Sequence, residues 1–439
     1  MQSFWYADEH YPYHLKAFAV LDSDVDPVHL KKAWDRTKQI YPVIDMAMQV
    51  FDEDIYFFDV SPEIGNTDES DAPVCPGGEA TAGRAMALTF SGKTITLTAY
   101  HSLVDEFGIR QVLATLLRAY LCDFPGSFDP EFKPEDIFIQ NTMLAPEDYK
   151  PQPLTLYGNS ADIFYDDSIP YDMDEPMTAS CIRVSRRAFM EIATAGRSSA
   201  GGESAEGQTT IRLSCPEAVL SAITARTVYE LYTNERRALS LDMLTDFRGA
   251  FGIRSSIAPC SKHLPMIVSY DEVMEGSFEE AVQRICSLRE TQTSDDYLKS
   301  YLALDNTYAV LGQKRPAAAV AYMDVLSPAL QRMASSSGMS DAQGSEAEKI
   351  GSGTARELMS ESDVNAVETG LPIRQVAVSY LEKRSVLMIG YGESMWIYLQ
   401  FGDRTEDYTN AMMRVLENVG IEATVITEAR RVPVEITEA

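Results

Sequence analysis

His101 and Asp105 stand four residues apart, at a point where a strand-like run of the sequence gives way to a helix-like one. An imidazole has an unperturbed pKa of about 6.5, so it can take up a proton near neutral pH and return it readily. A histidine at the end of a strand is therefore a candidate general base. Taken alone, His101 can equally be a surface or core histidine whose hydrogen bonds are met.

Asp105 comes directly before the expected start of the helix, near Phe107. Its carboxylate can cap free backbone N–H groups of the first turn and face the positive end of the helix. It can also pair with an arginine such as Arg248, which would hold the corner rigid and orient His101 indirectly. Both roles are structural, so we expect that Asp105 does not itself transfer a proton.

The corner needs a strand before it and a helix after it, and the sequence predicts both. Residues 94–100 alternate threonine with apolar side chains, as a half-buried strand does. From Phe107 to Leu121 the apolar residues recur at helical spacing. Upstream, Asp26 and Pro27 begin another helix with an N-cap, a proline at the first helical position and an apolar stripe.

The chain of 439 residues is expected to form two lobes, both mixed α/β. We place the boundary near residue 160, after a stretch of weak periodicity with three prolines. This gives an N-terminal lobe of residues 1–160, which carries His101 and Asp105, and a C-terminal lobe of residues 161–439.

Further elements are predicted on both sides of that boundary. Residues 214–217 resemble a capping box that opens a helix. Segments rich in Gly, Ser or Pro are expected to be loops, at residues 61–83, 195–208 and 334–356. Strands or helices are expected at residues 15–21, 55–60, 181–194, 374–381, 385–391, 395–401 and 406–419.

The H-x-x-x-D core of His101 and Asp105 resembles that of the chloramphenicol-acetyltransferase-like superfamily, which includes peptide-synthetase condensation domains and alcohol acetyltransferases. The helix from Asp26 to Tyr41, the segment around Arg248 and the terminal strands followed by a helix fall in the order of that superfamily. The resemblance covers most of the chain. It implies an α/β fold of two chloramphenicol-acetyltransferase-like lobes that form a V-shaped pseudo-dimer with a central cleft.

The same resemblance implies an acyltransferase. His101 would act as the general base on a hydroxyl or amine of a small-molecule acceptor, which then attacks the carbonyl of an acyl thioester. The thioester of CoA or of a carrier protein would be a cosubstrate, with no tightly bound cofactor. Asp105 and Arg248 would support the site as a structural ion pair.

Four residues are candidates for lining the site or its tunnel, and several depart from the usual pattern H-H-x-x-x-D-G. Tyr100 replaces the first histidine. Glu106 replaces the glycine, and its carboxylate would narrow the channel, repel an anionic donor or mark a degenerate site, while Gly108 could recover some room. Asp324 falls where relatives have a Ser-Asn or similar pair.

Two alternatives stay open. The chain could be a non-catalytic condensation-like module that binds a carrier protein or small molecule, with Glu106 as the sign of lost chemistry. As a variant of the leading hypothesis, it could be a stand-alone condensation domain that acts on acyl or peptidyl chains held on a carrier protein.

Charge limits the partners. There are 66 acidic and 37 basic residues, which gives a formal net charge of −29. Such a field repels phosphate backbones and anionic lipid, so no nucleic-acid partner is expected. It would also slow a polyanionic donor such as an acyl-CoA unless a local basic patch offsets it.

Other site classes are not indicated. Cys260 and His263 lack an orienting third group for a cysteine nucleophile, and His10 and His14 lack a third ligand, so no metal is expected. No G-x-S-x-G, Walker A or G-x-G-x-x-G motif occurs. The six cysteines form no disulfide framework, and no apolar run reaches about 18 residues, so we expect a cytoplasmic protein with no membrane span.

Overall fold

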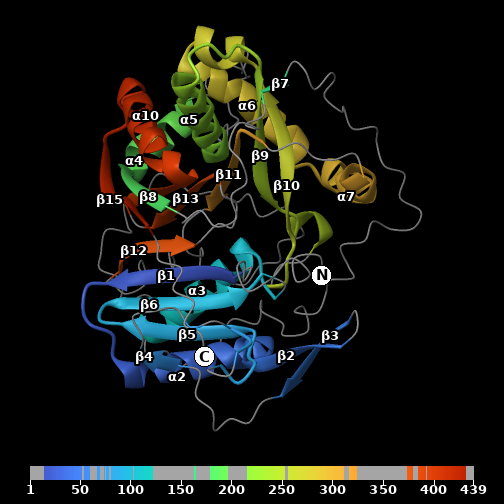
Figure 1. Cartoon of the computed structure of the whole chain (residues 1–439), viewed down its shortest axis with the longest axis vertical. Coiled ribbons are helices and arrows are strands. Elements are labelled where there is room, and N and C mark those ends of the chain that lie inside the picture. The colour runs from blue at the N-terminus through green and yellow to red at the C-terminus, as the bar shows by residue number, and fades with distance from the viewer. Residues whose placement is uncertain are drawn as a thin grey trace, which may run out of the picture.

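Two β-sheets with helices packed on them form the two lobes of the protein (Figure 1). This computed structural model describes residues 14–51, 54–59, 67–69, 74, 76–78, 81–101, 103–121, 163–164, 178–195, 215–252, 256–310, 316–323, 373–378, 384–391 and 393–431. The two-lobed α/β architecture predicted from the sequence is confirmed.

The first lobe is a five-stranded sheet with two helices against it. In spatial order its strands are β12 (Ile373–Val378), β1 (His14–Leu21), β6 (Thr94–Tyr100), β5 (Met86–Ser91) and β4 (Thr67–Glu69). β4 is a correction to the loop expected over residues 61–83, because three residues there pair in parallel with β5. A separate hairpin joins β2 (Met46–Phe51) to β3 (Asp54–Asp59).

The helices of the first lobe are α2 (Pro27–Ile40) and α3 (Glu106–Leu121), which pack against each other. The carboxylate of Asp26 accepts hydrogen bonds from the N–H groups of Val28 and His29, so the predicted N-cap is confirmed. The apolar stripe of α2 is buried, at Leu30, Ala33, Trp34, Thr37 and Ile40. A short 3₁₀ helix follows at Pro42–Asp45.

The second lobe is an eight-stranded sheet. Along it lie β10 (Ser261–Val268), β9 (Ala238–Asp246), β11 (Ala318–Met323), β13 (Ser385–Tyr391), β14 (Ser394–Gln400), β8 (Thr178–Ser185) and β15 (Ala423–Arg431), and β7 (Ile163–Phe164) pairs with β9. Its helices are α4 (Arg186–Ala195), α5 (Pro216–Leu231), α6 (Phe278–Gln292), α7 (Asp295–Val310) and α10 (Thr405–Asn418). Short helical turns lie at Gly249–Phe251, Asp271–Glu275 and Gly402–Arg404.

The helix predicted after residue 214 is present as α5, while Ser214, the first residue of the expected capping box, lies outside the described residues. Cys215 occupies the N-cap position and its side chain makes no capping hydrogen bond, while Pro216 takes the first helical position. Proline suits this position because its missing N–H would have no partner there. A capping box is formed at α6, where Ser277 and Glu280 exchange hydrogen bonds.

The second sheet is covered on both faces, and the alternating residues of β11 contact a different apolar cluster on each face. Along β11, Ala318, Val320 and Tyr322 join the apolar cluster of α4, α5, α6 and α10. Ala319, Ala321 and Met323 join the cluster of the first lobe. Since successive side chains of a strand point to opposite faces, one apolar strand can serve both lobes.

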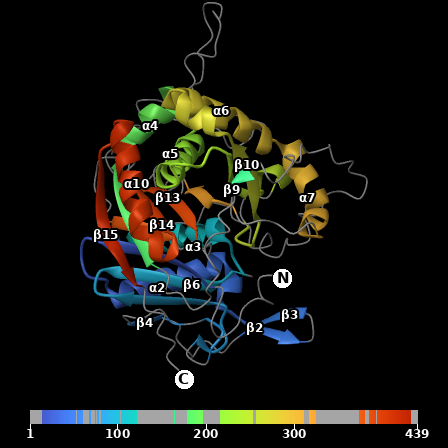
Figure 2. The same cartoon turned by 45° about the horizontal axis from the view of Figure 1, so that its top comes forward.

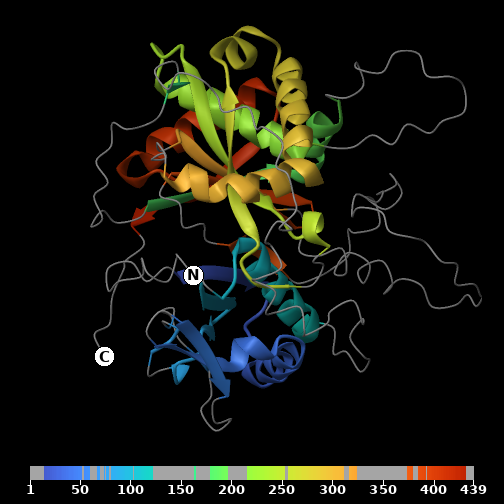
Figure 3. The same cartoon turned by 90° about the vertical axis from the view of Figure 1, so that its right-hand side faces the viewer.

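β12 crosses from the C-terminal part of the chain into the first sheet. It pairs antiparallel with β1, and Figure 1 shows it between the two lobes, which Figures 2 and 3 show from other directions. The Tyr398 hydroxyl of β14 donates a 3.0 Å hydrogen bond to the carbonyl of Val376 in β12, which links the two sheets. The boundary near residue 160 lies outside the described residues and stays a prediction.

Two of the loops expected from composition, at residues 195–208 and 334–356, lie almost wholly or wholly outside the described residues. Among the helices that the structure describes, none combines the length and apolar character needed to cross a bilayer.

Candidate active site

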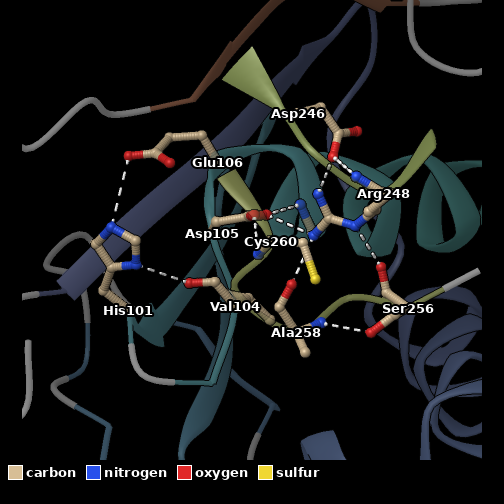
Figure 4. Close-up of polar contacts among 10 residues, drawn as sticks. His101, Val104, Asp105, Glu106, Asp246, Arg248, Ser256, Ala258 and Cys260 are labelled. Carbon is tan, nitrogen blue, oxygen red and sulfur yellow. Dashed lines mark hydrogen bonds and ion pairs between the residues drawn. The ribbon is translucent and has the colours of Figure 1, made fainter. Parts of the chain in front are cut away.

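His101 lies in the turn between β6 and α3, as the sequence predicted. The N–H groups of Leu103 and Val104 donate to the carbonyl of Tyr100, which closes the turn. Nδ1 of His101 lies 3.1 Å from the carbonyl oxygen of Val104 (Figure 4). Because a carbonyl only accepts, Nδ1 must carry the hydrogen of the neutral ring, and Nε2 then holds the basic lone pair.

Asp105 is fully buried and both of its carboxylate oxygens are hydrogen-bonded. Oδ1 accepts from the Gly108 N–H at 2.7 Å and from Nη2 of Arg248 at 2.7 Å, and Oδ2 accepts from the Cys260 N–H at 2.8 Å. Burial alone would raise the pKa of Asp105, but the charge and hydrogen bonds of Arg248, with the two N–H groups, bring it below its ordinary value. The carboxylate therefore stays ionised and acts as a helix cap and an ion-pair partner.

Arg248 holds several segments of the second lobe on this carboxylate. Its guanidinium donates to the carbonyls of Ser256 and Ala258 at 2.8 and 2.7 Å, and to Asp246 at 2.9 Å. Burial has the largest single effect and works to lower its pKa, but the charges of Asp105 and Asp246 and the hydrogen bond to Asp105 together outweigh it and leave the pKa raised. The Asp105 and Arg248 pair suggested by the sequence is thus present.

Glu106 is the first residue of α3, and its carboxylate faces the imidazole. Oε1 lies 3.8 Å from Nε2 of His101, and the side chain is only 3% exposed, while that of His101 is 24% exposed (Figure 4). The N-terminal end of a helix favours an ionised carboxylate. Glu106 therefore lies against the basic nitrogen of His101.

The other candidate lining residues are placed differently. The ring of Tyr100 lies edge-on to His14, with centroids 4.5 Å apart, and against Gly77. Gly108 is buried, and a Cβ there would lie 2.2 Å from the carbonyl oxygen of Ile257, so its missing side chain admits that backbone and gives no room beside His101. Asp324 lies outside the described residues.

His263, on β10, is a neighbour of His101 that sequence analysis did not assign to the site. Burial lowers the pKa of His263 to about 4, with further lowering by the charges of His101 and Lys262. His263 follows Cys260 by three residues, and Cys260 is bound to the Asp105 carboxylate of the other lobe. The only sequence signal was the spacing from Cys260, whose N–H binds Asp105 and so fixes the start of β10 beside the corner.

The remaining site classes gain no support. Burial raises the pKa of the Cys260 thiol to about 12, which opposes a role as a thiolate nucleophile. Within the described parts of the chain, no three His, Cys, Asp or Glu side chains are grouped to hold a metal ion. A cavity of about 280 Å³ lies elsewhere, in the second lobe, between α5, α10 and the turn at Tyr270.

The structure thus combines a two-lobed α/β fold with a histidine turn that the Asp105 and Arg248 pair connects to both lobes. No model of a protein family matches the chain, and no curated protein matches it. Solved structures do match it over nearly its whole length, and they confirm the two-lobed α/β fold.

Three of these structures illustrate the likeness, each 12% identical in sequence. F. graminearum TRI101 complexed with coenzyme A and deoxynivalenol has a TM-score of 0.59, over 94% of this chain and 96% of that one. The first condensation domain of the CDA synthetase has a TM-score of 0.56, over 92% and 91%. Polyketide synthase associated protein 5 from Mycobacterium tuberculosis has a TM-score of 0.55, over 92% and 93%. At this identity the likeness shows the fold.

Proposed function

We propose that the protein is an acyltransferase that moves an acyl group from a thioester to a hydroxyl or amine, with His101 as the general base. The observation that carries this proposal is the 3.1 Å contact of Nδ1 with the Val104 carbonyl. That contact fixes the tautomer whose Nε2 can accept a proton. The ring is partly exposed, as a base that meets a substrate must be.

In the proposed reaction, Nε2 of His101 first accepts a proton and later donates it. Nε2 takes the proton of the acceptor, and the acceptor oxygen or nitrogen attacks the thioester carbonyl. The carbon–sulfur bond then breaks, and the proton on Nε2 passes to the leaving thiolate. Holding base and acceptor together in this way avoids the entropy cost of a collision.

Asp105 and Arg248 take the role of positioning residues in this proposal. Their hydrogen bonds fix the first turn of α3 against the segment from Ser256 to Cys260. Since His101 lies directly before that turn, its Nε2 would be held in one place. Because Asp105 is held ionised by Arg248 and two N–H groups, neither side chain is assigned a proton-transfer step.

We further propose CoA or a carrier protein as the donor of the acyl group. The complexes of TRI101 with coenzyme A support a CoA thioester. A cytoplasmic location belongs to the same proposal, and it agrees with the four cysteines that the structure describes, none of which is in a disulfide.

The test is a thiol-release assay with short and long acyl-CoAs and a set of alcohols and amines. His101→Ala should lower the rate by about 10²–10⁴-fold. His29→Ala is the matched control, because that ring packs on Tyr120 near the C-terminal end of α3, whereas His101 lies before its N-terminal end. Equal thiol release by the wild type and His101→Ala would refute the assignment of the base.

A further inference from the structure

We propose that the acceptor is a cationic amine, bound as its ammonium form by the Glu106 carboxylate beside Nε2 of His101. This inference rests on the proposed acyl transfer and names the class of its acceptor. The juxtaposition that carries it is the 3.8 Å between Oε1 of Glu106 and Nε2 of His101, with the carboxylate almost wholly buried.

Glu106 lies on the side of the His101 ring that a substrate can reach. Nδ1 of His101 is directed to the Val104 carbonyl, so a substrate can meet only the Nε2 side of the ring. The Glu106 carboxylate lies on that side (Figure 4). A group that gives its proton to Nε2 would therefore come within reach of Oε1.

The positively charged or titratable side chains near the imidazole are either paired or neutral. Arg248 pairs with Asp105 and Asp246, so that positive charge is balanced on the other side of the turn. His263 is neutral near pH 7, because burial lowers its pKa to about 4. Neither Arg248 nor His263 therefore places an unbalanced positive charge beside a bound ammonium group.

A hydroxyl acceptor and an ammonium acceptor differ in the number of protons that they lose. A hydroxyl loses one proton in acyl transfer, and His101 alone can take it and pass it to the thiolate. An ammonium group must lose two. Glu106 can take the first, which leaves to solvent and yields the neutral amine, and Nε2 takes the second as the carbon–nitrogen bond forms. The carbon–sulfur bond breaks, and the products are an amide, a thiol and one released proton.

The field of the whole protein is consistent with such an acceptor. A net charge of −29 attracts cations at long range and raises their local concentration near the surface. The charge that disfavours a polyanionic donor therefore favours an ammonium acceptor.

The first experiment measures binding without a donor, by calorimetry or ligand-observed NMR. The probes are hexylamine and 1-hexanol, which share a chain length and differ in charge at neutral pH. The wild type should bind hexylamine at least about tenfold more tightly, and Glu106→Gln should remove this preference. Glu106→Asp, which keeps the carboxylate, should retain part of it.

A matched control is Glu191→Gln, which removes a carboxylate from an exposed pair on α4. Thermal unfolding of each variant checks that the fold is retained. Equal affinity for both probes, no measurable binding of hexylamine, or a preference that survives Glu106→Gln overturns the inference.

The second experiment adds acyl-CoAs and separates this inference from the proposed function. Amide should form faster than ester, and Glu106→Gln should lower kcat/KM for hexylamine about 10–100-fold, far more than for 1-hexanol. Amide formation that is unaffected by Glu106→Gln, or ester formation that is faster than amide formation, would overturn the cationic acceptor and leave acyl transfer standing. Binding of hexylamine that depends on Glu106, without thiol release from any donor, would do the reverse.

Discussion

Nη2 of Arg248 donates a 2.7 Å hydrogen bond to Oδ1 of Asp105, a residue 143 positions earlier in the chain. The two side chains come from different lobes, and both are buried. Their pair joins the end of β9 to the first turn of α3. The turn that carries His101 is therefore held by both lobes at once.

Arg248→Ala should lower the free energy of unfolding by about 3–5 kcal/mol, because it leaves the buried Asp105 carboxylate without its charge partner. Urea unfolding followed by circular dichroism measures this. Arg187→Ala is the control, since its pair with Glu191 is 87% and 65% exposed and should contribute little. A loss below that of the control would mean that the pair does not hold the lobes.

Gly108→Ala should lower the free energy of unfolding by about 1–3 kcal/mol, the usual result of overpacking a core. The new Cβ would lie 2.2 Å from the carbonyl oxygen of Ile257, so the backbone must move. Gly249→Ala is the control, because nothing lies within 4 Å of a Cβ there. Thermal unfolding distinguishes the two, and equal stability would contradict the close approach.

Glu106→Gly restores the glycine of the related motif and tests whether the chain is a degenerate binding module. If Glu106 serves the reaction, amide formation should fall by about tenfold or more. Product formation followed by mass spectrometry decides this. A gain of activity would instead favour the alternative, in which the glutamate marks lost chemistry.

Acid should destabilise the protein already between pH 6.5 and pH 4. Burial lowers the pKa of both His14 and His263 to about 4, so in that range the unfolded chain binds protons that the folded chain does not. Their stabilising contribution is complete above pH 6.5 and is lost as the pH falls toward 4. Urea unfolding at a series of pH values should show this slope, and His263→Gln should make it shallower. An identical slope in the variant would contradict the prediction.

The sequence was sufficient to predict those elements that depend on neighbouring residues. The alternation in residues 94–100, the stripe of α2 and the cap of Asp105 depend on neighbours a few residues away, and the structure contains all three. β12 was recognised as a strand, but its partner β1 lies more than 350 residues earlier, and no local pattern encodes that pairing.

In the site, too, residues with a local or family pattern were predicted, and those that depend on contacts between distant segments were not. His101 and Asp105 could be found from their spacing, and Arg248 from resemblance. His263 could not, because its place beside His101 depends on how β10 leaves the Asp105 carboxylate through Cys260. The role of Gly108 was misjudged for a similar reason, since the backbone of Ile257 that fills its space comes from the other lobe.

The pairing of β1 with β12 bears on how the protein is made. During synthesis, one edge of β1 stays unpaired until residues 373–378 have emerged from the ribosome. Unpaired strand edges promote aggregation. A fragment that stops near residue 160 would keep that edge permanently, so chaperone dependence should rise sharply when translation is truncated there.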